Sequence, residues 1–175
     1  MKIGIKDIVL RYSLIMLLGF FISIFYFIFK PLTVYSVYFI LKLFYTVTLS
    51  NNTLIVNNTE IEIINACIAG SAYYLLFLLN FSTRNIKFKK RIFVFFIDSA
   101  ALFLINILRI IILSVLLIKE SFLFESIHLI FWYLLSILIV FLIWIFTAKI
   151  LKIKSVPIIS DFLVIKKMIT SKVKR

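Results

Sequence analysis

Residues 92–118 read IFVFFIDSAALFLINILRIIILSVLLI. Only Asp98 and Arg109 carry a charge in this run, and the five cations before it stop at Arg91. A bilayer hydrocarbon core is crossed by roughly 20 apolar residues of helix. The run is therefore long enough and apolar enough to predict a membrane-spanning helix, with charge marking the end at which it begins.

Three further runs predict spans of the same kind. They cover Tyr12 to Phe29, about Ile64 to Phe81, and Ile127 to Leu151. The first follows three cations and lacks a small-residue cleavage site, so it predicts a retained signal anchor. We therefore expect an all-α polytopic membrane protein of about four transmembrane helices.

The composition excludes other classes of protein. Hydrophobic residues make up 64% of the chain and the mean hydropathy is +1.18, whereas soluble domains are about 45–50% apolar. The net charge of +13 comes from cations in the gaps between apolar runs, not on a folded polar face, so it does not predict nucleic-acid binding. The single cysteine excludes an internal disulfide framework, and no metal-ligand spacing accompanies it.

The cations also predict an orientation, because Lys and Arg near span ends resist translocation. Three lie before the first run, five in the loop from Arg84 to Arg91, and eight from Lys149 onward. An even number of spans places all three groups in the cytoplasm, together with both termini. We expect a membrane-embedded domain over residues 1–155 and a basic cytoplasmic tail over residues 156–175. Four glutamates then lie on the outer face: Glu60, Glu62, Glu120 and Glu125.

The apolar segment from Pro31 to Leu49 is long enough for a fifth span. A fifth span would put the later cationic groups on the opposite side of the membrane from the N-terminal one. Lys42 and three tyrosines in this segment suit the headgroup zone. We favour an interfacial or re-entrant helix here, with a span as the alternative.

The next segment has strand chemistry. Leu54 to Val56 and Thr59 to Ile63 predict the arms of a short outer β-hairpin. Asn57 and Asn58 between them tolerate the positive φ of its turn. The hairpin leads directly into the second predicted span.

Polar residues inside the spans are the informative ones, because each costs free energy there. Arg109 lies roughly 26 Å along its helix from Ile92, near the outer boundary. Asn106, three residues earlier, shares its helix face. Cys67 lies about one turn into the second span from the outer side, and His128 opens the fourth span from that side. Three residues on three spans are thus predicted at one depth.

These residue types together predict a thiol active site. A cysteine needs a neighbouring base or cation to react as a thiolate at neutral pH. His128 can supply the base, and Arg109 can stabilise a thiolate or an oxyanion. Structural readings compete with this one: Cys67 as a small buried hydrophobe, His128 as an interfacial residue, and Arg109 as a snorkelling side chain.

At these positions the sequence resembles the exosortase/archaeosortase family of membrane cysteine transpeptidases. The resemblance covers about Thr53 to Trp144, in the order Cys, Arg, His, and the small Lys- and Ile-rich form looks more like an archaeosortase variant. It is carried by three segments: Asn65-Ala66-Cys67 with Ala69-Gly70-Ser71, Asn106 to Ile110, and His128. Two features depart from the family: Ile68 and Ala69 replace the Ser/Thr and Gly that commonly follow the Cys, and a Gly one turn after the His is missing.

The resemblance implies cleavage of C-terminal sorting signals of secreted proteins on the outer face. Cys67 is then the nucleophile, His128 moves the proton and Arg109 holds negative charge, with Asn106 in a supporting position. The implied partners are the sorting-signal helix and a lipid-type acceptor. No metal or cofactor is implied.

A second functional class stays open beside the enzyme. A small membrane scaffold or transporter subunit would use Arg109 as a structural or ion-pathway charge. A shared depth of Cys67, Arg109 and His128 favours the enzyme. A wide separation of the three side chains in space would favour the scaffold.

Overall fold

A computed structural model describes residues 13, 16, 19, 22–83 and 86–152. The predicted tail over residues 156–175 and most of the first predicted span before Ser23 lie outside this part. The described chain is mostly helical and carries one small antiparallel sheet. Three of its helices are long and apolar enough to cross a membrane, or four if one bent helix pair counts as a single span.

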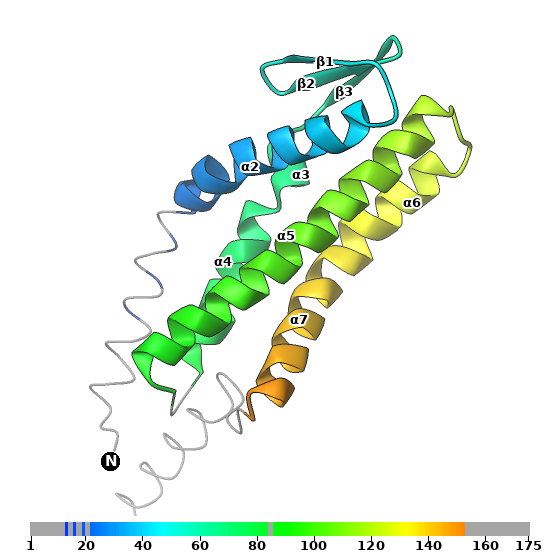
Figure 1. The fold of residues 1–175 in the computed structure, drawn as a ribbon. Coiled ribbons are helices and arrows are strands. Elements are labelled where there is room, and N and C mark those ends of the chain that lie inside the picture. The colour runs from blue at the N-terminus through cyan, green and yellow to red at the C-terminus, as the bar shows by residue number, and fades with distance from the viewer. Residues whose placement is uncertain (1–12, 14–15, 17–18, 20–21, 84–85, 153–175) are drawn as a thin grey trace, which may run out of the picture.

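The longest helix, α5 (Phe88–Ile118), includes the whole run predicted from residues 92–118 and begins one turn earlier. Figure 1 shows it running the length of the molecule, with α4 and the pair α6–α7 alongside and α2 across its upper half. The β-sheet lies at the end where α5 finishes. We call this the sheet end, and the end where α5 begins the cation end.

Helix α2 (Ser23–Lys42) corrects two predicted boundaries. It continues through Pro31, where the sequence analysis ended one span and began an interfacial helix. Proline removes one backbone hydrogen bond, but breaking the whole helix would leave more backbone groups unpaired, and in an apolar environment each costs several kcal/mol. The cost of one missing bond is smaller, so the helix continues through Pro31.

The sheet has three strands where a two-stranded hairpin was predicted. The hairpin forms from β2 (Thr53–Val56) and β3 (Thr59–Glu62), and β1 (Val47–Ser50) pairs antiparallel with β2. Both turns use two asparagines. Asn57 and Asn58 have φ of 46° and 76°, as a tight hairpin turn needs, and Asn51 has φ of 54°.

Strand β1 lies where the predicted interfacial helix was to end. Val47 and Thr48 are β-branched and Leu49 returns to the same face as Val47, which suits a half-buried strand. Apolarity alone does not distinguish such a short segment from the end of a helix. The predicted segment from Pro31 to Leu49 is therefore divided between α2 and β1.

The second and fourth predicted spans are both interrupted. The second consists of α3 (Asn65–Ile68) and α4 (Gly70–Ser82), separated by Ala69 in the left-handed region at φ 57°. The fourth consists of α6 (Phe124–Ile130), the π-helical turn η1 (Phe131–Leu135) and α7 (Ser136–Ile150). Its two halves are bent by 53° relative to each other. Both interruptions lie beside the middle of α5 (Figure 1), where Ala69 and Phe131 border a small hollow together with Asn106.

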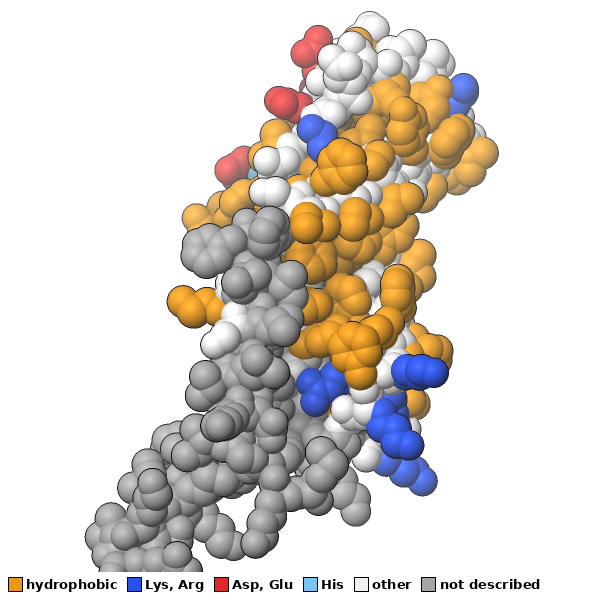
Figure 2. Space-filling model, turned by 90° about the vertical axis from the view of Figure 1, so that its left-hand side faces the viewer, with side chains coloured by type: hydrophobic (Ala, Val, Ile, Leu, Met, Phe, Trp, Pro, Cys, Tyr) orange, Lys and Arg blue, Asp and Glu red, His pale blue; other side chains and the backbone are white. Residues whose placement is uncertain are grey.

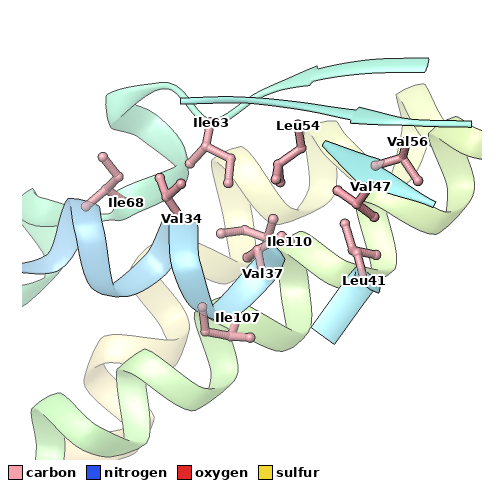
Figure 3. Packing of buried hydrophobic residues seen from close by; sticks show 10 residues of the cluster. All are labelled: Val34, Val37, Leu41, Val47, Leu54, Val56, Ile63, Ile68, Ile107 and Ile110. Carbon is pink, nitrogen blue, oxygen red and sulfur yellow. The ribbon is translucent and has the colours of Figure 1, made fainter. Parts of the chain in front are cut away.

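Two clusters of buried apolar side chains hold the fold. In the first, side chains from the sheet point toward those of α2 and α5, as Figure 3 shows for Leu54 and Ile63 above Val37 and Ile110. The second joins α4, α5 and α7 around Tyr73. The first cluster fixes the sheet against the helices and so fixes the chain that enters α3.

The outer surface of the helices is apolar. Phe27, Leu104 and Phe146 are each more than 60% exposed, as helices in contact with lipid require. Figure 2 shows apolar side chains over the middle of one face and most of the Lys and Arg side chains gathered near the cation end, whereas the acidic side chains lie at the sheet end together with a smaller share of the cations. This pattern is consistent with a membrane protein whose two ends differ in charge.

Candidate functional site

Cys67 lies in the single turn of α3, just before the break at Ala69. The chain enters this turn from β3 through Ile64, which is extended, and the Cys67 N–H donates to the Ile64 carbonyl at 2.9 Å. The left-handed conformation of a non-glycine residue such as Ala69 costs about 1–2 kcal/mol. The neighbouring Ile68 is buried in the first apolar cluster. The Cys67 side chain is half-buried and forms no disulfide.

Asn106 secures this break from the neighbouring helix α5. Its Nδ2 donates to the Cys67 carbonyl oxygen at 2.7 Å. Carbonyls at a helix end lack an intrahelical partner, and an amide from outside the helix satisfies this one. Asn106, predicted to support the site, therefore contacts the backbone of Cys67 and not its thiol.

Arg109 follows Asn106 by three residues on α5 and is only 9% exposed. Its Cζ lies 6.0 Å from the centroid of the Phe131 ring, within the range of a cation–π interaction. It also interacts electrostatically with Cys67. A cation beside a thiol favours the thiolate form. The guanidinium is therefore held within the bundle and close to the cysteine.

His128 lies in α6, with its ring between two aromatic neighbours one turn away on either side. The ring centroids lie 5.5 Å from Phe124 and 6.0 Å from Trp132. The imidazole is half-buried. These two aromatic neighbours pack against the ring from within the same segment.

Cys67, Arg109 and His128 all line one cavity of about 190 Å³ at the sheet end. The cavity lies between β3 with its continuation, the end of α5, and α6. Asn106 lies outside it, on a smaller hollow that shares Arg109. In the part of the chain that the structure describes, no hydrogen bond joins the thiol to the imidazole. Catalytic hydrogen bonds are often longer in apo active sites than in substrate complexes.

Three polar residues that line this cavity were not predicted from the sequence as site residues. Glu60 and Glu62 come from β3, and Ser114 comes from α5, one turn beyond Ile110. The alternation of Thr59 to Ile63 placed the glutamates on one face of a strand, but the direction of the free edge depends on tertiary packing. Ser114 had only a weak signal, as a hydroxyl within an apolar run.

The small residues around Cys67 face two different neighbours. A Cβ added to Gly70 would lie 2.7 Å from ring atoms of Tyr26, so Gly70 lets α2 approach α4. Ala66, Ala69, Ser71 and Ala72 instead border a second hollow of about 280 Å³ that Arg109 also reaches. Gly70 thus makes a close helix approach within this chain.

The described residues include no group of three or more His, Cys, Asp or Glu side chains placed to hold a metal ion. Comparisons of the chain with protein-family models, with curated proteins and with solved structures give no match. The functional assignment therefore rests on the residues of the cavity and their chemistry: a thiol, an imidazole, a buried cation and two carboxylates.

Proposed function

We propose that this chain is a membrane-embedded cysteine peptidase or transpeptidase that acts on C-terminal sorting signals of secreted proteins. The observation that carries the proposal is the shared cavity of Cys67, Arg109 and His128, contributed by three separate helices. A nucleophile, a proton-transfer group and a charge stabiliser in one cavity are the groups that acyl transfer needs.

In the proposed first step the Cys67 thiolate attacks the carbonyl carbon of the scissile peptide bond. A C–S bond forms, and the carbonyl oxygen becomes an oxyanion within reach of the Arg109 guanidinium. The C–N bond then breaks, and the leaving amine takes a proton from the His128 imidazolium. A thioester between Cys67 and the protein to be sorted remains.

In the second step a hydroxyl or amine of a lipid headgroup attacks the thioester, and neutral His128 accepts its proton. The C–S bond breaks and the Cys67 thiolate is restored. In a bilayer the exposed apolar helices would be surrounded by lipid, so headgroups would lie close to the thioester and compete with water for it. We propose the sheet end as the outer side, with both termini in the cytoplasm, because the cation end carries Lys87, Lys89, Lys90 and Arg91.

The proposal is tested in cells that carry the chain, by comparing the C-terminal masses of their secreted proteins. Cys67→Ser should leave a set of proteins with their full C-termini, because a hydroxyl is far less ionised than a thiol. His128→Ala should slow processing by about 10²–10⁴-fold. Ser126→Ala, an exposed change two residues away on α6, is the matched control and should process normally.

The intermediate offers a second readout. A wild-type sample denatured during turnover should carry a substrate adduct on the peptide that contains Cys67, and neutral hydroxylamine should release it because it cleaves thioesters. Unchanged processing by a normally inserted Cys67→Ser chain would eliminate the enzyme. Loss of processing only through failed insertion would leave Cys67 as a packing residue and restore the scaffold or transporter-subunit reading.

A further inference from the structure

Strand β3 lies at an edge of the sheet, since the strand order is β1-β2-β3. The Ile63 N–H donates to the Asn52 carbonyl at 3.0 Å, and Ile61 and Thr59 lie opposite Leu54 and Val56. Backbone groups alternate in direction along an antiparallel strand. Those of Glu60 and Glu62 therefore point away from β2, toward the free edge.

The free edge borders the cavity that holds Cys67. The residues from Glu60 to Ile64 line that cavity, together with residues of α5 and α6, and none of its lining residues belongs to β1 or β2. The strand then continues through Ile64 into the turn that carries Cys67. A chain paired with this edge would therefore run along the cavity and past the thiol.

The two sides of the edge differ in chemistry. The side chains of Glu60 and Glu62 are exposed on one face of β3, whereas Ile61 and Ile63 pack toward the apolar cluster. Across the cavity from the edge, α5 presents Ile110, Leu113 and Leu117. Side chains of neighbouring strands pair on the same face. A strand added here would place basic side chains beside the glutamates and apolar ones toward α5.

Ser114 gives a second, independent indication of a ligand. It lines the cavity and is 2% exposed, and within the described part of the chain its hydroxyl has no hydrogen-bond partner. A buried hydroxyl without a partner costs about 1–3 kcal/mol. A backbone or side-chain group of a bound chain would remove that cost.

Other occupants fit the edge less well. A phosphate-bearing lipid would meet the like charge of two glutamates and cannot pair with alternating N–H and C=O groups. A second copy paired through its own β3 would set glutamate against glutamate, which is destabilising. An extended polypeptide with basic side chains satisfies both the charge and the backbone.

We propose that the free edge of β3 binds an extended segment of the substrate polypeptide as a fourth strand, with basic and apolar side chains in alternation. The inference rests on the proposed function, since it states how the substrate of that cavity is held. Backbone pairing at an edge gives affinity, and pockets for alternate side chains give sequence preference. The scissile bond is then carried past Cys67 in extended form.

The test uses the full chain with Cys67→Ser in nanodiscs and a fluorescent acetyl-Ile-Lys-Ile-Lys-Ile-Lys-Ile-amide probe, followed by anisotropy. Two matched derivatives carry N-methyl groups on either the lysine or the isoleucine amides. If the probe is a strand, one derivative should lose affinity by roughly tenfold or more because its hydrogen bonds to the edge are lost. The other should bind as well as the parent, and sensitivity of the lysine amides identifies antiparallel pairing.

Two protein variants provide the reciprocal test. Glu60→Pro removes one outward N–H, at a type of position where edge strands tolerate proline, and should weaken binding by roughly tenfold. Glu60→Gln keeps that N–H and should bind more weakly only at low salt, because it loses only screened charge attraction. Replacing the probe lysines by glutamates should abolish binding above the empty-nanodisc background.

The fourth-strand proposal would be overturned by an equal loss of affinity for both N-methylated probes. It would also be overturned if Glu60→Pro bound the parent probe as tightly as the chain with Glu60. The assay needs no chemistry, so its outcome is separate from that of the enzyme. If only one N-methylated probe loses affinity and the chain processes no substrate, the edge-strand proposal stands and the peptidase proposal fails. If the chain processes its substrates but both N-methylated probes bind alike, the peptidase proposal stands and the edge-strand proposal fails.

Discussion

Arg109 lines the cavity that it shares with Cys67 and His128, and it also borders two neighbouring hollows, one beside Asn106 and one beside the small residues of α3 and α4. An arginine keeps its positive charge at neutral pH even when it is buried, because the guanidinium group stays protonated in proteins. This fixed charge interacts favourably with a thiolate at Cys67. Replacing Arg109 should therefore change the reactivity of the Cys67 thiol more than it changes the stability of the fold.

We expect Arg109→Gln to slow alkylation of Cys67 at neutral pH by roughly tenfold, the effect of a neighbouring cation on a thiol. The chain has one cysteine, so incorporation of iodoacetamide by the folded protein reports on this thiol alone. Arg91→Gln, at the cation end, is the control and should alkylate at the wild-type rate. Equal rates in Arg109→Gln and wild type would show that Arg109 does not act on Cys67.

Asn106 acts on the backbone of the same residue. Asn106→Ala removes the donor to the Cys67 carbonyl, and an unsatisfied buried carbonyl costs about 1–3 kcal/mol. We expect a lower melting temperature in detergent and weaker protection of the thiol, since α3 is a single turn. Asn65→Ala, at an exposed asparagine of the same turn, should have neither effect. Wild-type stability of Asn106→Ala would mean that the hydrogen bond does not hold the turn.

The residues of the cavity could be predicted only in part. Cys67, Arg109 and His128 are polar residues in predicted apolar spans. Each costs free energy there, so each stands out in the sequence. Glu60 and Ser114 were not visible in this way, because exposed glutamates and single serines are common. Only the packing of β3 against α5 brings them to the cavity.

At the scale of the helices, the break at Ala69 depends on how closely α2 approaches α4. A methyl group added at Gly70 would meet the Tyr26 ring at 2.7 Å, closer than such contacts allow. Gly70→Ala should therefore destabilise the fold by about 1–3 kcal/mol, the usual range for overpacking. The measurement is thermal unfolding in detergent micelles.

Tyr26→Leu supplies the matched background for that measurement. The smaller side chain should tolerate Gly70→Ala, so the double variant should be more stable than the sum of the two single changes predicts. Additive effects would place the strain somewhere other than the contact between Tyr26 and Gly70.

Elements with strong periodicity or length followed from the sequence, and local interruptions did not. The predicted helix over residues 92–118 and the turn at Asn57 and Asn58 both form, because span length and positive φ tolerance are local properties. Pro31 was misread as a boundary, since its local cost is outweighed by the continuous helix. The π-helical turn at Phe131–Leu135 has no local signal in the sequence.

On the scale of the molecule, the two ends differ in charge and should lie on opposite sides of the membrane. In a Cys67→Ser background, a cysteine at exposed Asn58 should react with an impermeant maleimide added to intact cells. A cysteine at exposed Lys87 should react only after permeabilisation. Equal labelling of both in intact cells would remove the proposed outward-facing site.

One buried contact bears on how the chain enters the membrane during synthesis. Asn80 of α4 donates to Asp98 of α5 at 2.7 Å, and both side chains are buried. Helix α4 with α3 only just meets the length and apolarity of a span, whereas α5 far exceeds them. A polar residue costs less in the bilayer when its partner enters beside it, so α4 and α5 should leave the translocon as a hairpin. In a glycosylation-based insertion assay, residues 65–82 alone should insert poorly and residues 65–118 well, with Asp98→Leu losing part of the gain, whereas full insertion of residues 65–82 alone would remove the dependence.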